Sequence, residues 1–301
     1  FPSLSFKLKL ASFDEIKALF SYSKHLVLNG IIKTVGSKAG PMIITRLFDL
    51  TSLAIQQVAA NLVAHAQAFV GTITGVFSPI YNKMAARNQN MEKVFILTTT
   101  INIFVGSILF SCLLMFGKVF IVLWVGEEFE YAAYIIFFSV FSFLCSGFTT
   151  SANNILLAQA NHKLLSLISF FIVVVNIPLA IFLGQTIGLV GLAMAGATTN
   201  FIFNVLVKMS LFRHYNDYKV GKVYLRFIVS VLLVYSIGFV GAALLEKLAI
   251  DTWLELIISG ALAFPVVVLI CWFVILDKAL KEMITNLLVD KFNLNKKVNS
   301  Q

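Results

Sequence analysis

Residues 164–184, LLSLISFFIVVVNIPLAIFLG, decide what kind of protein this sequence encodes. The stretch holds no charged side chain, and a helix of this length rises about 30 Å at 1.5 Å per residue. The hydrocarbon core of a bilayer is also about 30 Å thick. Inside lipid a backbone can satisfy its own polar groups only as a helix or a closed barrel. The stretch therefore predicts a membrane-spanning helix.

Similar apolar runs recur along the whole chain. They cover 25–48, 53–81, 94–116, 131–157, 164–184, 187–209, 225–246 and 253–276. The 301 residues are 59% hydrophobic and only 12% charged, with a mean hydropathy of +0.92, whereas soluble domains are about 25% charged. This composition excludes an ordinary soluble domain. We predict an all-α membrane protein with eight transmembrane helices.

The positive charges occupy alternate connections between the predicted helices. One set of connections carries Lys7, Lys9, Lys17, Lys24, Lys83, Arg87, Lys93, Lys163, Lys208, Arg213, Lys219, Lys222, Arg226, Lys278, Lys281, Lys291, Lys296 and Lys297. The other set carries acidic groups such as Glu127, Glu128 and Glu130. By the positive-inside rule both termini are expected in the cytoplasm. The net charge of +9 then reflects orientation, and no nucleic-acid partner is expected.

The same pattern divides the chain into four parts. Residues 1–24 are expected to be a cytoplasmic amphipathic linker, 25–212 a six-helix lobe, 213–277 two additional transmembrane helices, and 278–301 a basic cytoplasmic tail. Position 1 is Phe rather than Met, which suggests a fragment of a longer protein. The three cysteines lie in separate apolar runs, so no disulfide or metal site is predicted. No catalytic motif and no cofactor-binding motif is found.

Two lysines interrupt the first apolar run and are the first candidate site residues. Lys33 and Lys38 lie where a Lys at mid-membrane costs on the order of 2.5–3.5 kcal/mol on insertion scales. In one interpretation they attract a phosphate-bearing head group into a cavity. In the other, their long side chains reach to the cytoplasmic interface.

Polar side chains in later runs give a second set of candidates. Gln57, Asn61 and His65 recur every four residues and so share one face of a helix. Such a face could line a passage for sugars, with His65 changing charge near neutral pH, or it could bond to neighbouring helices. Asn102 and Asn200 are weaker examples of the same signal. The candidate substrate-binding residues are therefore Lys33, Lys38, Gln57, Asn61, His65, Asn102 and Asn200.

Four stretches together resemble the bacterial polysaccharide flippases, of the O-antigen type, in the multidrug/oligosaccharidyl-lipid/polysaccharide exporter superfamily. Residues 20–88, ending in GVFSPIYNKMAARN, resemble the seventh and eighth spans of that family. IVLWVGEEFEYAAYIIFF (121–138) resembles the connection between spans nine and ten. NNILLAQANHKLLS (153–166) and GQTIGLVGLAMAGATTN (184–200) resemble the two connections that follow. The order and spacing of these stretches carry the resemblance.

The resemblance implies a two-lobe exporter fold, of which this chain would supply the carboxy-terminal lobe of six helices plus two additional helices. The two lobes would rock between inward-open and outward-open states. The implied substrate is a polyprenyl-pyrophosphate-linked oligosaccharide, flipped across the cytoplasmic membrane for O-antigen, lipopolysaccharide or other surface polysaccharide. The implied partners are the missing amino-terminal lobe, the lipid bilayer and a polysaccharide polymerase. Lys33 and Lys38 would then attract the pyrophosphate, and the protein would be a transporter rather than an enzyme.

Two other functions are compatible with parts of the pattern. A multidrug antiporter of the same fold would be expected to carry an acidic residue in its cavity, and no Asp or Glu lies mid-span here. An integral-membrane enzyme, such as a polysaccharide polymerase or an acyltransferase, should show a large outer loop or His and acidic residues within its spans. Neither feature is found in the sequence.

Overall fold

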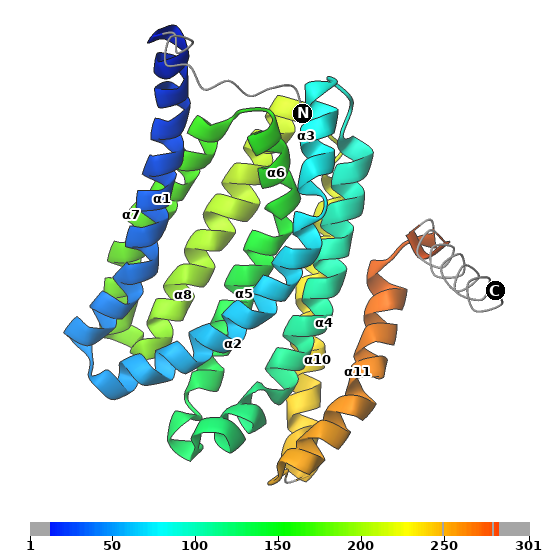
Figure 1. Cartoon of the computed structure of the whole chain (residues 1–301). Coiled ribbons are helices and arrows are strands. Elements are labelled where there is room, and N and C mark those ends of the chain that lie inside the picture. Colours follow the sequence, from blue (N-terminus) through cyan, green and yellow to red (C-terminus); the bar gives the residue numbers. More distant parts are fainter. Residues whose placement is uncertain (1–12, 249, 279, 283–301) are drawn as a thin grey trace, which may run out of the picture.

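The computed structural model describes residues 13–248, 250–278 and 280–282, and within these ranges the chain is helical with no strand (Figure 1). The helices are α1 (Phe13–Leu47), α2 (Leu50–Gly75), α3 (Ser78–Ala86), α4 (Glu92–Val125), α5 (Ala132–Phe148), α6 (Thr150–Ala158), α7 (His162–Ile187), α8 (Leu189–Asn200), α9 (Met209–Asn216), α10 (Gly221–Leu248) and α11 (Trp253–Ile275). A 3-10 turn, η2 (Glu127–Phe129), precedes α5, and a π-helix, η3 (Phe201–Lys208), joins α8 to α9. The all-α prediction is confirmed for this part of the chain.

Six helical segments of the described chain are long and apolar enough to cross a membrane. They are Glu92–Val125, Ala132–Ala158, His162–Ile187, Leu189–Asn216, Gly221–Leu248 and Trp253–Ile275. The remaining two expected spans, 25–48 and 53–81, are long helices but are more polar, because α1 carries Lys33 and Lys38, and α2 carries Gln57, Asn61 and His65. The protein is thus a multi-pass integral membrane protein, and the count of eight spans stays a prediction.

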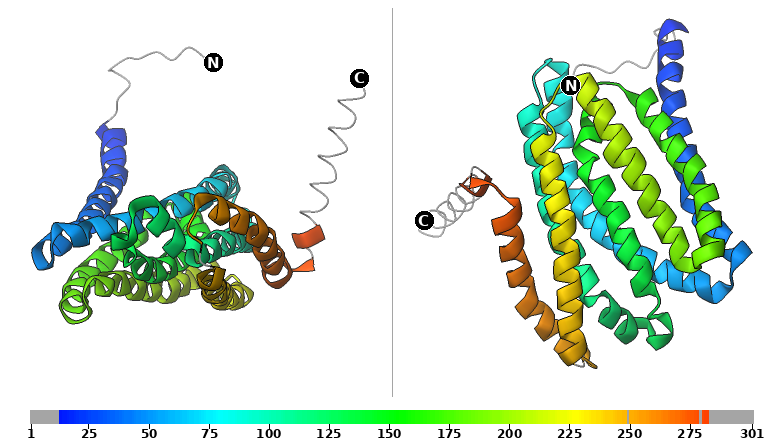
Figure 2. Two further views of the ribbon diagram at one scale, coloured as in Figure 1. Left: turned by 90° about the horizontal axis from the view of Figure 1, so that it is seen from below. Right: turned by 180° about the vertical axis from the view of Figure 1, so that it is seen from behind.

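The helices lie side by side in a row. α1 packs on α7, α7 on α8, α8 on α5, and α5 on α4, while α10 and α11 both pack on α4. α2 runs obliquely from the end of α1 to α3 and rests on α4 and α5 (Figure 1). α1 and α2 meet at the turn at Phe48 and Asp49 and diverge from there, as the view from behind shows (Figure 2, right). One face of α1 and α2 is therefore left without a neighbour in the described chain.

The first nine helices form three similar hairpins, each a long helix followed by a broken one. α1 precedes α2 and α3, α4 precedes α5 and α6, and α7 precedes α8, η3 and α9. Each broken helix ends in a non-glycine residue with positive φ, namely Asn88, Ala160 or Asp217. The expected span 53–81 is divided by a break at Val76 and Phe77, whereas the expected spans 131–157 and 187–209 correspond to the segments Ala132–Ala158, interrupted at Thr149, and Leu189–Asn216, which continues through η3. Pro79 lies in the first turn of α3, where its missing N–H costs nothing.

The four parts predicted from the sequence can be compared with the structure only where residues are described. Residues 13–24 of the expected linker belong to α1, which continues without interruption to Leu47. Residues 1–12 and 283–301, which hold the rest of the expected linker and most of the expected tail, lie outside the described residues. The two additional helices are α10 and α11, and both pack on α4.

The turn between α7 and α8 requires a glycine for a steric reason. A Cβ added to Gly191 would lie 2.1 Å from the Leu183 carbonyl oxygen, whereas a Cβ on Gly196 of the same helix meets nothing within 4 Å. Backbone atoms cannot move aside as a flexible side chain can, so the turn would have to open. Gly196 is therefore a matched control for a substitution at Gly191, because both lie on α8 and only Gly191 is in close contact with backbone atoms.

We expect Gly191→Ala to lower the free energy of unfolding by about 1–3 kcal/mol, the usual cost of overpacking. Gly196→Ala should leave it unchanged or slightly raised, since Ala favours the helix. Thermal unfolding of the two purified variants in detergent measures the difference. Equal midpoints would contradict the steric argument.

Asp49 caps α2 in a pH-dependent way. Its carboxylate accepts a 2.7 Å hydrogen bond from the Ser52 amide, and this bond holds the pKa of the carboxyl below its usual value. A lowered pKa means that the cap stabilises the helix above the unfolded pKa, about 3.9. The stabilisation is lost as the pH falls through the folded value.

We expect amide exchange in the first turn of α2 to accelerate, relative to the intrinsic rate, as the pH falls below about 4. Hydrogen exchange followed by mass spectrometry from pH 6 to pH 3 measures this. Asp49→Asn keeps a capping oxygen that does not titrate, so its protection should not change over that range. An identical pH dependence in both proteins would rule out Asp49 as the cause.

Candidate functional site

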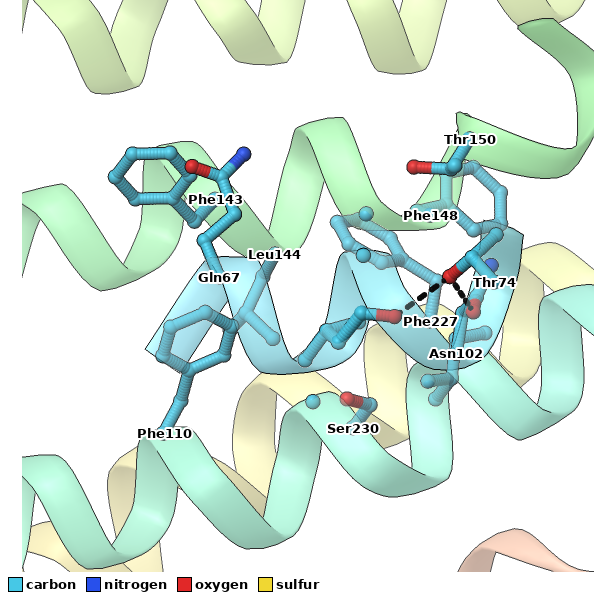
Figure 3. A pocket seen from close by; sticks show the side chains of 15 residues that line it. Gln67, Thr74, Asn102, Phe110, Phe143, Leu144, Phe148, Thr150, Phe227 and Ser230 are labelled. Atoms are coloured by element: carbon cyan, nitrogen blue, oxygen red, sulfur yellow. Dashed lines mark hydrogen bonds between the residues drawn. The ribbon is translucent and has the colours of Figure 1, made fainter. Parts of the chain in front are cut away.

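Two cavities with polar walls lie inside the bundle. The α1–α7–α8 cavity has a volume of about 310 Å³ and is lined by Ile32, Lys33, Gly36, Ser169, Ile172, Val173, Asn176, Ile177, Gly196, Thr199 and Asn200. The α2–α4–α5–α10 cavity has a volume of about 200 Å³ and holds Asn102 in its wall (Figure 3). Helix α5 lies between them, because it packs on α8 on one side and on α2 and α4 on the other.

The α1–α7–α8 cavity combines apolar side chains with amides, hydroxyls and one cation, Lys33, which is exposed. Lys33 reaches it from α1, and Asn176 on α7 donates a 3.1 Å hydrogen bond to the Thr199 hydroxyl on α8. Asn200 donates to the Ser142 hydroxyl on α5 at 2.8 Å. Two of the predicted site residues, Lys33 and Asn200, therefore meet in one cavity although they are far apart in the sequence.

A line of hydrogen bonds continues from Asn200 along the π-helix. Asn204 donates to the Asn200 side-chain oxygen at 2.6 Å, and Lys208 donates to the Asn204 oxygen. The π-helix covers Phe201–Lys208, and such segments occur often at functional sites. The line thus joins the cavity wall to a second cation, Lys208, which is partly buried.

Lys33 and Lys208 are near enough to repel each other. Neither has a carboxylate partner among the described residues, where the ion pairs involve Lys118 and Arg226. Two cations at membrane depth are costly without an anion. The arrangement is therefore suited to bind an anion from outside the protein.

Lys208 is a site residue that we missed in the sequence. We ended the predicted span at 209 and placed Lys208 in a basic loop, whereas the helical segment continues to Asn216. A usable signal was present, because Asn200, Asn204 and Lys208 follow at intervals of four residues, as Gln57, Asn61 and His65 do.

The predicted residues on α2 and the second lysine of α1 lie elsewhere. Gln57, Asn61, His65 and Lys38 are exposed, and none of them lines either cavity. Gln57 donates to Asn61 at 2.8 Å on the helix surface. Their role as cavity-lining residues stays a prediction.

This exposed face of α2 differs from the other exposed faces of the bundle. α2 exposes Ala54, Gln57, Asn61, Ala64, His65 and Ala68 along one side. α10 and α11 instead expose large apolar side chains, including Leu232, Phe239, Leu262 and Phe273, as helices that contact lipid do. The α2 face suits water or another protein segment better than lipid.

Asn102 belongs to a buried hydrogen-bond network beside the second cavity. Thr74 on α2 donates to the Asn102 oxygen at 2.6 Å, and the Asn102 amide donates to Ser151 on α6 at 3.4 Å. Thr98 lies 2.9 Å from the Ser151 hydroxyl and also hydrogen bonds with Tyr81 on α3. Four helices are thus joined through buried polar side chains.

Residues 2–134 match the sequence profile of a family described as "polysaccharide biosynthesis protein". The matched region includes α1 to α4 and therefore Lys33, Lys38, Gln57, Asn61, His65 and Asn102. No curated protein sequence and no solved structure gave a significant match. A link to polysaccharide biosynthesis is supported for this part of the chain.

We expect Asn102→Leu to lower the free energy of unfolding by about 1–3 kcal/mol, because Thr74 and Ser151 lose a partner while buried. Adding Thr74→Val should recover part of this loss, since one orphaned hydroxyl is then removed. Asn61→Leu, on the exposed face, should change stability by less than about 0.5 kcal/mol. Thermal unfolding of the three variants measures this, and an equal loss from Asn61→Leu would contradict it.

Proposed function

We propose that this protein translocates a diphosphate-linked, lipid-anchored oligosaccharide across the cytoplasmic membrane, as part of a larger exporter. The match to a polysaccharide biosynthesis family and the six apolar spans support a membrane step in making a polysaccharide. The single observation that carries the proposal is Lys33 in the wall of the α1–α7–α8 cavity, with a second cation, Lys208, joined to that wall through Asn204 and Asn200.

A diphosphate is the anion that fits this pair best. Its two charges can offset two lysines that lack carboxylate partners in the described chain. Charge-assisted hydrogen bonds of this kind are about twice as strong as neutral ones. The neighbouring Asn176 amide donates one N–H to Thr199 and can donate its other N–H to a further phosphate oxygen.

The distribution of charge supports a direction for the transfer. The ends of α3, α6 and α9 carry Lys83, Arg87, Lys163, Arg213 and Lys219 in or beside them, and the opposite end carries Glu127, Glu128 and Glu130. By the positive-inside rule the first end faces the cytoplasm. Lys208, close to that end, would meet the head group first, and Lys33 would receive it in the cavity.

The exposed α2 face supports the second half of the proposal. Gln57, Asn61 and His65 offer amide and imidazole groups to sugar hydroxyls. A passage bordered by this face would need a second wall, which we propose is an amino-terminal lobe of the full-length protein. Lys38, also exposed, would lie on the same open side of α1 and α2.

We expect Lys33→Gln and Lys208→Gln, each in the full-length protein, to reduce transfer at least about tenfold, since a charged hydrogen bond contributes about 1.5–3 kcal/mol. Strains that carry only the variant should accumulate lipid-linked repeat units in the cytoplasmic leaflet. Lys222→Gln, on an exposed residue at the start of α10, is the matched control and should behave as wild type. Leaflet-specific labelling of the precursor and the amount of surface polysaccharide measure the effect.

The same experiment tests the alternative that the protein acts after the lipid-linked oligosaccharide has crossed the membrane. If repeat units reach the outer leaflet unpolymerised in these strains, the protein acts as a polymerase or beside one, and the proposal fails. Normal surface polysaccharide in the double variant would exclude the two lysines as the anion site.

A further inference from the structure

The α2–α4–α5–α10 cavity owes its space to three glycines on three different helices. Gly71 on α2, Gly106 on α4 and Gly147 on α5 all line it. A Cβ on Gly71 or Gly147 would meet nothing within 4 Å, and one on Gly106 would meet only the Phe110 ring at 3.8 Å. Alanine would fit at all three positions and would favour the helix. Close packing between the helices therefore does not require glycine at these three positions. The cavity does require it, because a larger side chain would fill part of its volume.

The walls of this cavity combine aromatic rings with neutral polar groups. Phe110, Phe143, Phe148 and Phe227 supply the rings, and Gln67, Thr74, Asn102, Thr150 and Ser230 supply amides and hydroxyls (Figure 3). No lining residue is charged. Ser230 also bonds to Ser107 at 2.7 Å, which holds α10 against α4 on the cavity floor.

This chemistry selects among possible occupants. A phosphate or another ion would find no opposite charge in the wall, and transfer of an ion into such a site is costly. A lipid tail would leave the Gln67 amide, for which the described chain provides no hydrogen-bond partner, facing hydrocarbon, whereas the other polar groups of the wall already bond within the protein. A neutral polyol satisfies both parts of the wall, because its C–H faces can lie on the phenyl rings while its hydroxyls bond to the polar groups.

We propose that this cavity holds one neutral pyranose ring of the oligosaccharide. The inference rests on the proposed function and adds a sugar subsite, separate from the anion site, inside the lobe itself. The volume of about 200 Å³ suits a single ring rather than a chain of sugars. The rest of the oligosaccharide would stay outside, along α2.

The two sites are next to each other across α5. Ser142 bonds to Asn200 at the α1–α7–α8 cavity, and the following residue, Phe143, lines the glycine-walled cavity. Gln67 and Gly71 are exposed on α2 and lie at the mouth of this second cavity.

Cysteine protection in the purified full-length protein tests the proposal. Cys112, Cys145 and Cys271 are first replaced by alanine, and Gly71→Cys, Gly147→Cys, Gly196→Cys or Gly75→Cys is added singly. Gly71 and Gly147 line the sugar subsite, and Gly196 lines the α1–α7–α8 cavity. Gly75, one turn beyond Gly71 on α2, lines neither and is the matched control, with nothing within 4 Å of its added Cβ.

Labelling with a small methanethiosulfonate reagent is followed with two kinds of probe. One is undecaprenyl diphosphate, and the other is the same lipid bearing one N-acetylglucosamine or one galactose. We expect both kinds to slow labelling of Gly196→Cys. Only a sugar-bearing lipid should slow labelling of Gly71→Cys and Gly147→Cys, by about fivefold or more, and neither should affect Gly75→Cys.

The outcomes separate the inference from the proposed function. Protection of Gly196→Cys by both lipids, with none of Gly71→Cys or Gly147→Cys by either sugar, overturns the sugar subsite and leaves the anion site standing. Absence of protection at Gly196→Cys overturns the anion site and the inference that rests on it. If the reagent labels neither Gly71→Cys nor Gly147→Cys in the absence of lipid, the α2–α4–α5–α10 cavity is closed, and this result also overturns the sugar subsite.

A cavity-filling pair gives a readout in cells. We expect Gly71→Leu to reduce surface polysaccharide at least fivefold, while Gly75→Leu on the same helix leaves it unchanged. Equal effects of the two variants at equal protein levels would contradict the subsite, because only Gly71 borders the cavity.

Discussion

A bilayer offers no water, so a buried polar group in this bundle is stabilised only by a partner within the protein. α4 shows the constraint most clearly, since Thr98, Thr100 and Asn102 are buried along its length. Together they bond to four neighbouring helices: Thr98 to α3 and α6, Asn102 to α2 and α6, and Thr100 to Arg226 of α10. α4 is therefore the element around which the neighbouring helices are placed.

The breaks in the helices follow from these bonds. The ends of α2 and α6 that hold Thr74 and Ser151 lie beside the interruptions at Phe77 and Thr149, and both hydroxyls bond to Asn102. Tyr81 and Ser151 follow these interruptions, and both bond to Thr98 of α4. At the opposite end Lys118 pairs with Glu130 and Glu246, which ties α4 to the start of α5 and the end of α10. These pairs are exposed and add little stability individually.

The candidate site was only partly predictable, and the reason lies in helix geometry. Lys33 and Asn200 were found because polar residues are conspicuous in apolar runs, and they do share a cavity. Asn102 was conspicuous for the same reason, but its bonds assign it to the core network beside a different cavity. Lys208 was missed because its helix extends beyond the apolar run through a π-helix, which no hydrophobic pattern reveals.

The sequence by itself determined that this chain is helical, enters a membrane and carries its basic residues on alternate connections, since these properties depend on local composition and length. Only the tertiary structure decided which polar residues share a cavity. Lys33, Asn200 and Lys208 lie on α1, α8 and η3, and packing of α1 and α8 against α7 brings them together. Packing also decided where Gly71, Gly106 and Gly147 meet, because the space left by a missing side chain depends on the helices that face it.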